Sequence, residues 1–349
     1  MTEIYLDPEK TEWDTYVTEN RSGVFAHLYS WGETLVSTYG LDIFRLTARK
    51  KGLHGRIVGV LPLILFSPPN FDKRLISLPY TDAAGILADD DDIFDRLLAA
   101  ALELATDLGT VHLELRQLGE MFFPNLAPDI EDRIQHTPHT FKVGLSRKLA
   151  PASEIIWTQL AAKVRNQVRK ARKSGCRAKI GGSELLDDFF SVFSENMRDL
   201  GSPVHAPELF QRVTEKMAVQ IFVVYTQDTP TAAALVLRHN ASLFNPWASS
   251  LRRFRPFCPN MLLYWTMLAY GSENGCRWFD FGRSTPGAST CRFKIQWGAE
   301  MQPLVWHIFS RKPHKWEPKN ESLEDDSWKT LDLNVSRRQG PSVRRWISL

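Results

Sequence analysis

The stretch that most constrains the fold of this chain is Trp278–Ser284, a short apolar run with alternating aromatic residues. Such a run is typical of a buried strand, and this one ends in a carboxylate, an arginine and a hydroxyl. Residues 260–270 before it are apolar at helical spacing, and Gly275 follows as a helix cap. The pattern predicts helix, tight turn, strand and polar corner, and open α/β sheets bind ligands at such corners.

The first half of the chain repeats this order of elements. We expect strands at 41–48, 56–66 and 75–78 with a hairpin at 49–55, a helix from Asp89 to Gly109, and a strand at 111–116. The second half has strands at 219–225, 231–238 and 242–249, the helix at 260–273, and the strand that ends at Phe281. Glu114 follows Gly109 by five residues, as Asp280 follows Gly275. The match predicts an architectural repeat, although helices that end in glycine and lead into strands are common.

Composition sets the outer limits of this interpretation. The chain has 349 residues and is 43% hydrophobic, which suits two globular domains, and its net charge of +3 permits an anionic partner without requiring one. Its four cysteines include no C-x-x-C pair, so we expect reduced thiols and neither disulfides nor a metal site. The first residues lack the features of a secretory signal, and the apolar run 57–66 is too short to span a membrane. We therefore expect a cytoplasmic protein without a transmembrane segment.

Several motifs resemble one protein family. Residues 280–284 (DFGRS), 292–294 (RFK) and 296–299 (QWGA) resemble the carboxyl-terminal signature of FemAB-type proteins, which have paired GNAT-like domains. Further segments resemble the branch of this family that is associated with exosortase and PEP-CTERM systems. These are residues 77–80 (SLPY), 168–175 (VRKARKSG) and 198–204 (RDLGSPV).

The resemblance implies an α/β fold with mixed sheets, in which two GNAT-like acyl-CoA N-acyltransferase half-domains are related by a pseudo-twofold axis. On this basis we expect one GNAT-like domain at 1–150, a linking basic helix at 151–175, a second GNAT-like domain at 176–312, and a tail at 313–349 that packs back on the body.

The activity implied by the resemblance is acyl or aminoacyl transfer to an amine or hydroxyl of a cell-envelope or exopolysaccharide precursor. No tightly bound cofactor is implied. The donor is acyl-CoA or an aminoacyl-tRNA, and the resemblance allows tRNA as a partner and peripheral contact with the inner membrane. Only one helix's worth of sequence, 153–173, lies between the halves, so the helical arm of classical tRNA-dependent members is absent. The alternative is a catalytically silent double-GNAT module that binds an envelope precursor or a partner protein.

Basic residues mark two candidate binding surfaces. GNAT domains bind pyrophosphate at a glycine-rich turn before a helix, but the corresponding turn here, 252–259, has no glycine and two prolines. Arg253 and Arg255 in this turn are candidates for binding phosphate through their side chains. Arg169, on the predicted helix 153–173, is a candidate for contact with tRNA, lipid-linked pyrophosphate or a membrane. For both surfaces, a solvated basic face is the alternative.

The candidate catalytic residues follow from what acyl transfer requires: proton removal from the nucleophile and stabilisation of an oxyanion. Asp280 is the first candidate for the base or for the group that orients the amine, and Lys294 would neutralise developing charge. Arg283 would anchor the acceptor, with Ser284 beside it, although an internal Asp280–Arg283 ion pair is an equal alternative.

Other polar residues are secondary candidates. His205 follows a Gly-Ser-Pro-Val loop and is a weaker candidate for catalysis, since a lone histidine more often has a structural role. Tyr80 and Asp82 would line the substrate cleft from the first half. His136 and His139 lack a clustered third ligand, so the sequence predicts no metal site.

Overall fold

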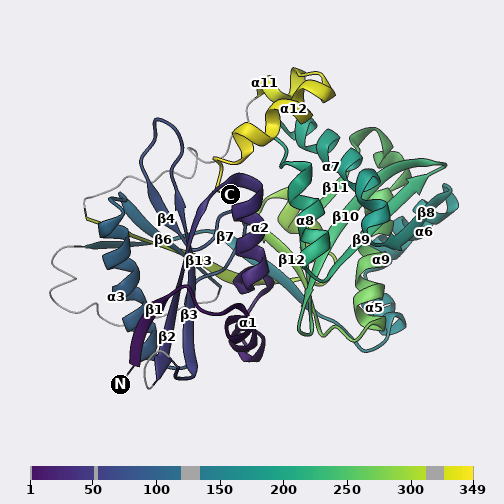
Figure 1. Cartoon of the computed structure of the whole chain (residues 1–349). Helices are drawn as coiled ribbons and strands as arrows, with labels where there is room; N and C mark the ends of the chain where they lie inside the picture. Colours follow the sequence, from purple (N-terminus) through teal and green to yellow (C-terminus); the bar gives the residue numbers. More distant parts are fainter. Residues whose placement is uncertain (1, 51–53, 119–133, 312–325, 349) are drawn as a thin grey trace. The chain divides into compact units, whose positions relative to one another are not determined.

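The computed structural model describes residues 2–50, 54–118, 134–311 and 326–348 (Figure 1). These residues form two compact units. Unit 1 comprises the described residues of Met1–Val143, Gln302–Glu321 and Trp346–Leu349, and unit 2 comprises those of Gly144–Met301 and Ser322–Arg345. Both units are mixed α/β structures, as the sequence predicts.

Unit 1 is built on a mixed sheet with the strand order β1-β2-β3-β4-β6-β13-β7, and β5 pairs with β3. The strands are β1 (Thr2–Leu6), β2 (Asp42–Lys50), β3 (Ile57–Phe66), β4 (Arg74–Ile76), β5 (Leu87–Ala88), β6 (His112–Leu118), β7 (Gln135–Lys148) and β13 (Glu300–Ser310). The helices are α1 (Lys10–Glu19), the short 3₁₀ helix η1 (Phe25–His27), α2 (Tyr29–Tyr39) and α3 (Asp91–Asp107). β7 passes from unit 1 into unit 2. Residues 51–53, at the tip of the predicted hairpin, lie outside the described part.

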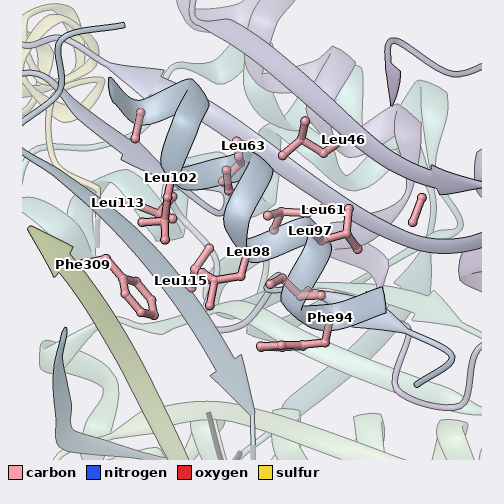
Figure 2. Close-up of a cluster of buried hydrophobic side chains, with 14 of the residues drawn as sticks. Leu46, Leu61, Leu63, Phe94, Leu97, Leu98, Leu102, Leu113, Leu115 and Phe309 are labelled. Atoms are coloured by element: carbon pink, nitrogen blue, oxygen red, sulfur yellow. The ribbon is translucent and has the colours of Figure 1, made fainter. Parts of the chain in front are cut away.

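Helices cover both faces of this sheet. Asp90 caps α3 by accepting the amide of Ile93, and Gly109, at a φ of +65°, lets the chain leave the helix. Figure 2 shows leucines of α3 packed among leucines of the strands, with Phe309 of β13 beside them. On the other face, Trp13 of α1 packs against β3. β3 is buried almost throughout because it is covered on both sides.

Unit 2 has the strand order β7-β12-β11-β10-β9-β8. Its strands besides the end of β7 are β8 (Cys176–Gly181), β9 (Val219–Thr226), β10 (Thr229–His239), β11 (Ser242–Ser250) and β12 (Trp278–Ser284). Its α-helices are α5 (Ser153–Gln159), α6 (Ala162–Lys173), α7 (Leu186–Leu200), α8 (Pro207–Lys216), α9 (Pro259–Glu273), α10 (Ser289–Ile295), α11 (Asp326–Thr330) and α12 (Leu333–Arg344). The 3₁₀ helices are η2 (Ser183–Leu185) and η3 (Arg252–Phe257). β10 is buried on both faces because α7 and α9 pack on it.

The prediction of one continuous helix over 153–173 is wrong. The chain breaks at Leu160 and Ala161, which both have extended backbone angles, and so separates α5 from α6. Leu160 is buried, and Gln159 just before it accepts a hydrogen bond from Arg147. These tertiary contacts hold the break, and no glycine or proline in the sequence signals it.

Candidate functional site

The candidate site in unit 2 begins where two neighbouring strands separate. β11 and β12 run parallel and pair over only three residues, Ser242–Phe244 with Trp278–Asp280. Beyond this short ladder both strands continue without pairing to each other. A bulge in β11 sets Asn245 and Pro246 opposite the single residue Val236 of β10. A bulge bends its strand, and proline offers no amide to a ladder, so the separation is built into the sequence.

The end of β12 brings the predicted catalytic groups together. Oδ1 of Asp280 accepts the amide of Gly282 at 2.5 Å, and Gly282 has a φ of +71°. Lys294, on α10, donates from Nζ to the main-chain oxygen of Gly282 at 3.2 Å and to that of Arg283 at 2.7 Å. The ammonium is thereby fixed at the carboxyl end of β12, beside Arg283 and within a few residues of Asp280.

Ser284, the last residue of β12, adds a buried hydroxyl. Its side chain is 95% buried, and its Oγ has no hydrogen-bond partner among the described residues. A buried hydroxyl without a partner costs free energy and calls for an explanation. It is the kind of group that a bound substrate would satisfy.

An aromatic layer supports the end of β12. Tyr264 of α9 stacks with Phe281 at a centroid distance of 5.9 Å and with Trp297 at 6.0 Å, and it meets the edge of Phe293 at 4.9 Å. Burial raises the pKa of Tyr264 to about 12, so its hydroxyl stays protonated at neutral pH. Asn245 donates to this hydroxyl at 3.5 Å. The sequence reasoning missed both polar residues, because Tyr264 lies in an apolar helix and Asn245 in a strand.

Arg147 positions the helix that carries Lys294. It lies at the end of β7 and is buried, and it donates to the main-chain oxygen of Trp297 and, at 2.7 Å, to Oε1 of Gln159. Gly298 has a φ of +79°, and a Cβ there would lie 3.0 Å from Nη1 of Arg147. A cation at the carboxyl end of a helix also interacts favourably with the helix dipole. Sequence reasoning missed this residue, since nothing local links position 147 to position 297.

The basic turn before α9 is a 3₁₀ helix, η3, with exposed Arg252, Arg253 and Arg255. Arg253 forms an ion pair with Glu195 of α7. Cys258, at a φ of +60°, then leads into α9, whose first residue is Pro259. The Sγ of Cys176 lies 3.8 Å from the oxygen of Phe257, so η3 lies beside the start of β8.

Arg169 lies apart from the end of β12, on the exposed side of α6. Its guanidinium lies 5.5 Å from the ring centroid of Trp157, and its Nη1 donates to Asn166 at 3.1 Å. Burial of Val164, Val168 and Ala171 leaves the basic residues of this helix on its outer face. The basic face that the sequence predicts is thus present on the shorter α6.

His205 is enclosed rather than presented to a cleft. It is 98% buried in the loop between α7 and α8, and burial together with the charge of Arg344 lowers its pKa well below the usual range. Gly340 of α12 packs tightly against the adjacent Val204. This environment suits a structural histidine rather than a catalytic one.

Tyr80 and Asp82 belong to unit 1, where both contribute main-chain groups. The amide of Tyr80 donates to the oxygen of Ser348 at 2.8 Å, and the oxygen of Asp82 accepts from the indole of Trp306 at 3.3 Å. The ring of Tyr80 contacts that of Tyr39, at a centroid distance of 5.3 Å.

Unit 1 contains a second short parallel ladder with the same pattern. β4 pairs with β6 over three residues, the last pair being Ile76 with Glu114, as Phe244 pairs with Asp280 in unit 2. Glu114 and Asp280 therefore occupy equivalent positions, which agrees with their equal spacing from Gly109 and Gly275. In unit 1, however, Glu114 is fully buried and paired with Arg116 at 2.7 Å.

The described part of the chain has neither a metal-type cluster nor a helix that could span a membrane. Within residues 2–50, 54–118, 134–311 and 326–348, no three His, Cys, Asp or Glu side chains gather as a metal site would require. No helix in the same ranges combines the length and apolar character needed to cross a membrane.

Comparison with known proteins places the fold. Residues 159–294 match the model of an acetyltransferase (GNAT) domain. No curated protein matches the sequence. Among solved structures, FemX is similar with a TM-score of 0.68 at 15% identity, over 87% of this chain and 96% of FemX.

Two further solved structures are similar over most of their length. L-PGS from Bacillus licheniformis has a TM-score of 0.58 at 11% identity, over 98% of each chain. A tandem GNAT protein from the clavulanic acid biosynthesis pathway has a TM-score of 0.54 at 12% identity, over 90% of this chain and all of that one. The chain therefore has a FemAB-like paired GNAT fold, and its residues 159–294 match the acetyltransferase (GNAT) domain family.

Proposed function

We propose that unit 2 transfers an acyl or aminoacyl group to an amine or hydroxyl of a cell-envelope or exopolysaccharide precursor. The observation that carries this proposal is the separation of β11 from β12, with Asp280, Lys294 and the Ser284 hydroxyl, which has no partner within the described ranges, at the end of β12. The GNAT match and the similarity to FemX support the reaction class. The exosortase-associated branch suggested by the motifs is the setting we propose for the acceptor.

The chemistry assigns a role to each group at the end of β12. The acceptor nitrogen or oxygen attacks the donor carbonyl, and its proton passes to Asp280. Lys294 stabilises the negative oxygen of the tetrahedral intermediate. Collapse of the intermediate breaks the bond to the thiol or ribose oxygen, which leaves and takes a proton. Arg283 binds an anionic group of the acceptor, and Ser284 hydrogen-bonds to it.

Both candidate donors, acyl-CoA and aminoacyl-tRNA, carry phosphates, and η3 is the surface we propose for them. Arg253 and Arg255 are exposed in this turn, which leads directly into α9. The bond of Arg253 to Glu195 holds the turn against α7 and leaves Arg255 as the better phosphate ligand. Arg169 and the rest of the basic face of α6 would contact a longer anionic partner, such as tRNA or the surface of the inner membrane. We place the protein in the cytoplasm, with this face toward that partner.

Parallel thermal-shift measurements with acetyl-CoA and an aminoacyl-tRNA would identify the donor, because a ligand that binds only the folded state raises the melting temperature. Arg255→Ala should reduce the shift, while Lys216→Ala, at an exposed position on α8, should leave it unchanged. No shift with either donor would instead favour a silent binding module. The observation that favours this second function is the turn 252–259, which has two prolines in place of the glycines with which GNAT domains bind pyrophosphate.

The catalytic assignment is tested with the donor so identified. The acceptors offered are a peptidoglycan precursor peptide and an amino-sugar oligosaccharide. Asp280→Ala and Lys294→Ala should abolish transfer yet keep the donor-dependent shift and the cooperative unfolding of the wild-type protein. If both variants transfer at the wild-type rate, the site is wrong.

A further inference from the structure

Unit 1 has its own separation of strands, and residues 346–348 occupy it. β4 ends at Ile76, and the mostly buried residues 78–83 follow before the amide of Ala84 donates to the oxygen of Arg116 on β6. Into this space comes the segment Trp346–Ser348, which contacts residues of unit 1 more than 200 positions earlier in the chain. Ile347 and Ser348 are buried there, and Ser348 has no exposed surface.

Arg116 and Tyr80 hold Ser348 by hydrogen bonds. Its main-chain oxygen accepts from Nη1 of Arg116 at 2.9 Å and from the amide of Tyr80 at 2.8 Å. Its hydroxyl accepts from Nη2 of Arg116 at 3.0 Å. The guanidinium thus donates to the carbonyl and to the side-chain hydroxyl of one residue at the same time, a two-point contact from a charged donor.

Arg116 is itself fixed before it meets this segment. Its Nε bonds Glu114, its Nη1 also donates to Thr81, and its guanidinium lies 4.0 Å from the ring centroid of Trp306. A fully buried arginine held on three sides is preorganised, with its remaining donors directed at Ser348.

The loop that closes over the segment is strained. Leu78 has a φ of +58° and Tyr80 a φ of +64°, two bulky residues in the left-handed region within three positions. Such conformations persist where surrounding contacts hold them, and they concentrate at ligand clamps. Tyr80 uses this conformation to direct its amide at Ser348.

Trp346 provides an aromatic contact at the other end of the segment. Its ring meets Phe66 of β3 edge to face, at a centroid distance of 5.9 Å. Phe66 is buried, and the guanidinium of Arg74 lies 5.0 Å from its ring centroid. The segment is therefore held by an aromatic contact at one end and a polar clamp at the other.

We propose that the separation between β4 and β6 in unit 1 is a peptide-binding site, and that residues 346–348 are its ligand in cis. The ligand class is a short peptide with an aromatic residue two positions before a serine, bound through the serine carbonyl and hydroxyl. This inference is independent of the transferase reaction proposed for unit 2.

The experiment uses a chain truncated after Arg345 and a fluorescent peptide with the sequence of residues 342–349. The truncated chain should bind the peptide, and the full chain, whose site is occupied, should bind it at least tenfold more weakly. In the peptide, Ser348→Ala should weaken binding roughly tenfold, since a hydrogen bond from a charged donor is lost. Ser342→Ala is the matched control, because Ser342 is exposed and bonds only Gln339 among the described residues.

Two results would overturn the proposal. One is a folded truncated chain that does not bind the peptide at millimolar concentration, and the other is equal weakening by Ser342→Ala and Ser348→Ala. If the truncated chain does not fold, a specific protease site inserted between Arg345 and Trp346 of the full chain allows the same test. After cleavage, the labelled peptide should replace the native fragment under native conditions. A nicked protein that stays folded and never exchanges the fragment would also contradict a binding site.

Discussion

The two parallel ladders, β4–β6 in unit 1 and β11–β12 in unit 2, have equal length and register. They differ in the residue that stands two positions after the last paired acid. Two positions after the equivalent acids Glu114 and Asp280, unit 1 has Arg116 and unit 2 has Gly282. The buried arginine bonds Glu114 and Ser348, whereas the glycine adds no side chain and has a positive φ near the end of its strand. The two strand pairs thus differ at one position. In unit 1 a buried arginine there holds residues 346–348 beside the strands, which we call the seal of unit 1, and in unit 2 a glycine there leaves a polar corner.

The residue after the last paired position on β4 and on β11 strengthens this contrast. In unit 1, Ser77 joins the two strands, because its amide donates to the oxygen of Glu114 and its hydroxyl accepts the amide of Arg116. In unit 2, the equivalent Asn245 lies in a bulge and bonds Tyr264 of α9 instead. In our proposals the same topology therefore supports a peptide-binding site in one unit and acyl transfer in the other.

The largest effect is expected at Arg116. Arg116→Ala leaves Glu114 buried without its charged partner and removes the donors to Ser348, so the free energy of unfolding should fall by about 3–5 kcal/mol. Urea unfolding measures this loss. The double variant Glu114→Gln with Arg116→Met should recover part of it. A loss below about 1 kcal/mol in the single variant would show that the seal contributes little to stability.

A smaller loss of stability is expected at Gly282, the equivalent position in unit 2, because a side chain there strains the backbone. Gly282→Ala places a Cβ at a φ of +71° and should cost roughly 1–2 kcal/mol, measured by urea unfolding. Gly282→Asn is the control at the same position, since asparagine tolerates this conformation better and should cost less. Equal stability of wild type and Gly282→Ala would mean that the turn at the end of β12 does not depend on glycine.

The stability of unit 1 should also depend on pH, because a histidine is buried in it. His307 of β13 lies opposite Leu115, and burial, reinforced by His136, lowers its pKa to about 3. The unfolded chain binds a proton below about pH 6.5 while the folded chain does not, so this contribution is complete above pH 6.5 and is lost progressively toward pH 3. Between pH 6.5 and 5.5 the expected loss is about 1 kcal/mol.

Urea unfolding at a series of pH values measures this contribution. His307→Gln removes one titrating group and should make the curve less steep over this range by the loss given above, while His205, whose pKa is also lowered by burial, keeps part of the slope. A variant with the same pH profile as the wild type would place the sensitivity elsewhere.

The smallest effect is expected at Ser284. Ser284→Ala removes a buried hydroxyl that has no partner among the described residues, so stability should stay equal or rise by up to about 1 kcal/mol. Ser336→Ala on α12 is the matched control, because its hydroxyl is also buried and without a partner in the described part of the chain. Both should behave alike in thermal unfolding, but only Ser284→Ala should slow transfer. Equal transfer rates would remove Ser284 from the site.

Much of the fold could be predicted from local sequence patterns. The helix α3 has an aspartate cap and a terminal glycine, and β12 has alternating aromatic residues, so both follow from the sequence. That Lys294 lies near the end of β12 could also be predicted, because only a short segment of chain separates them. The break before Ala162 was not predicted, since it depends on Gln159 meeting Arg147. The seal of unit 1 was not predicted either, because no local pattern links Arg116 to Ser348.

The discontinuity of unit 1 has a consequence for how the chain is made. Arg116 and its partner Ser348 are 232 residues apart. One edge of β6 pairs with β13, which is synthesised much later than β6. At about 5–20 residues per second, synthesis of that interval takes roughly ten to fifty seconds. Unit 2 lies mostly within this interval, so its sheet can form first while the edge of β6 stays unpaired. Conditions that slow translation there should therefore favour aggregation of the nascent chain, and chaperones that shield strand edges should relieve it.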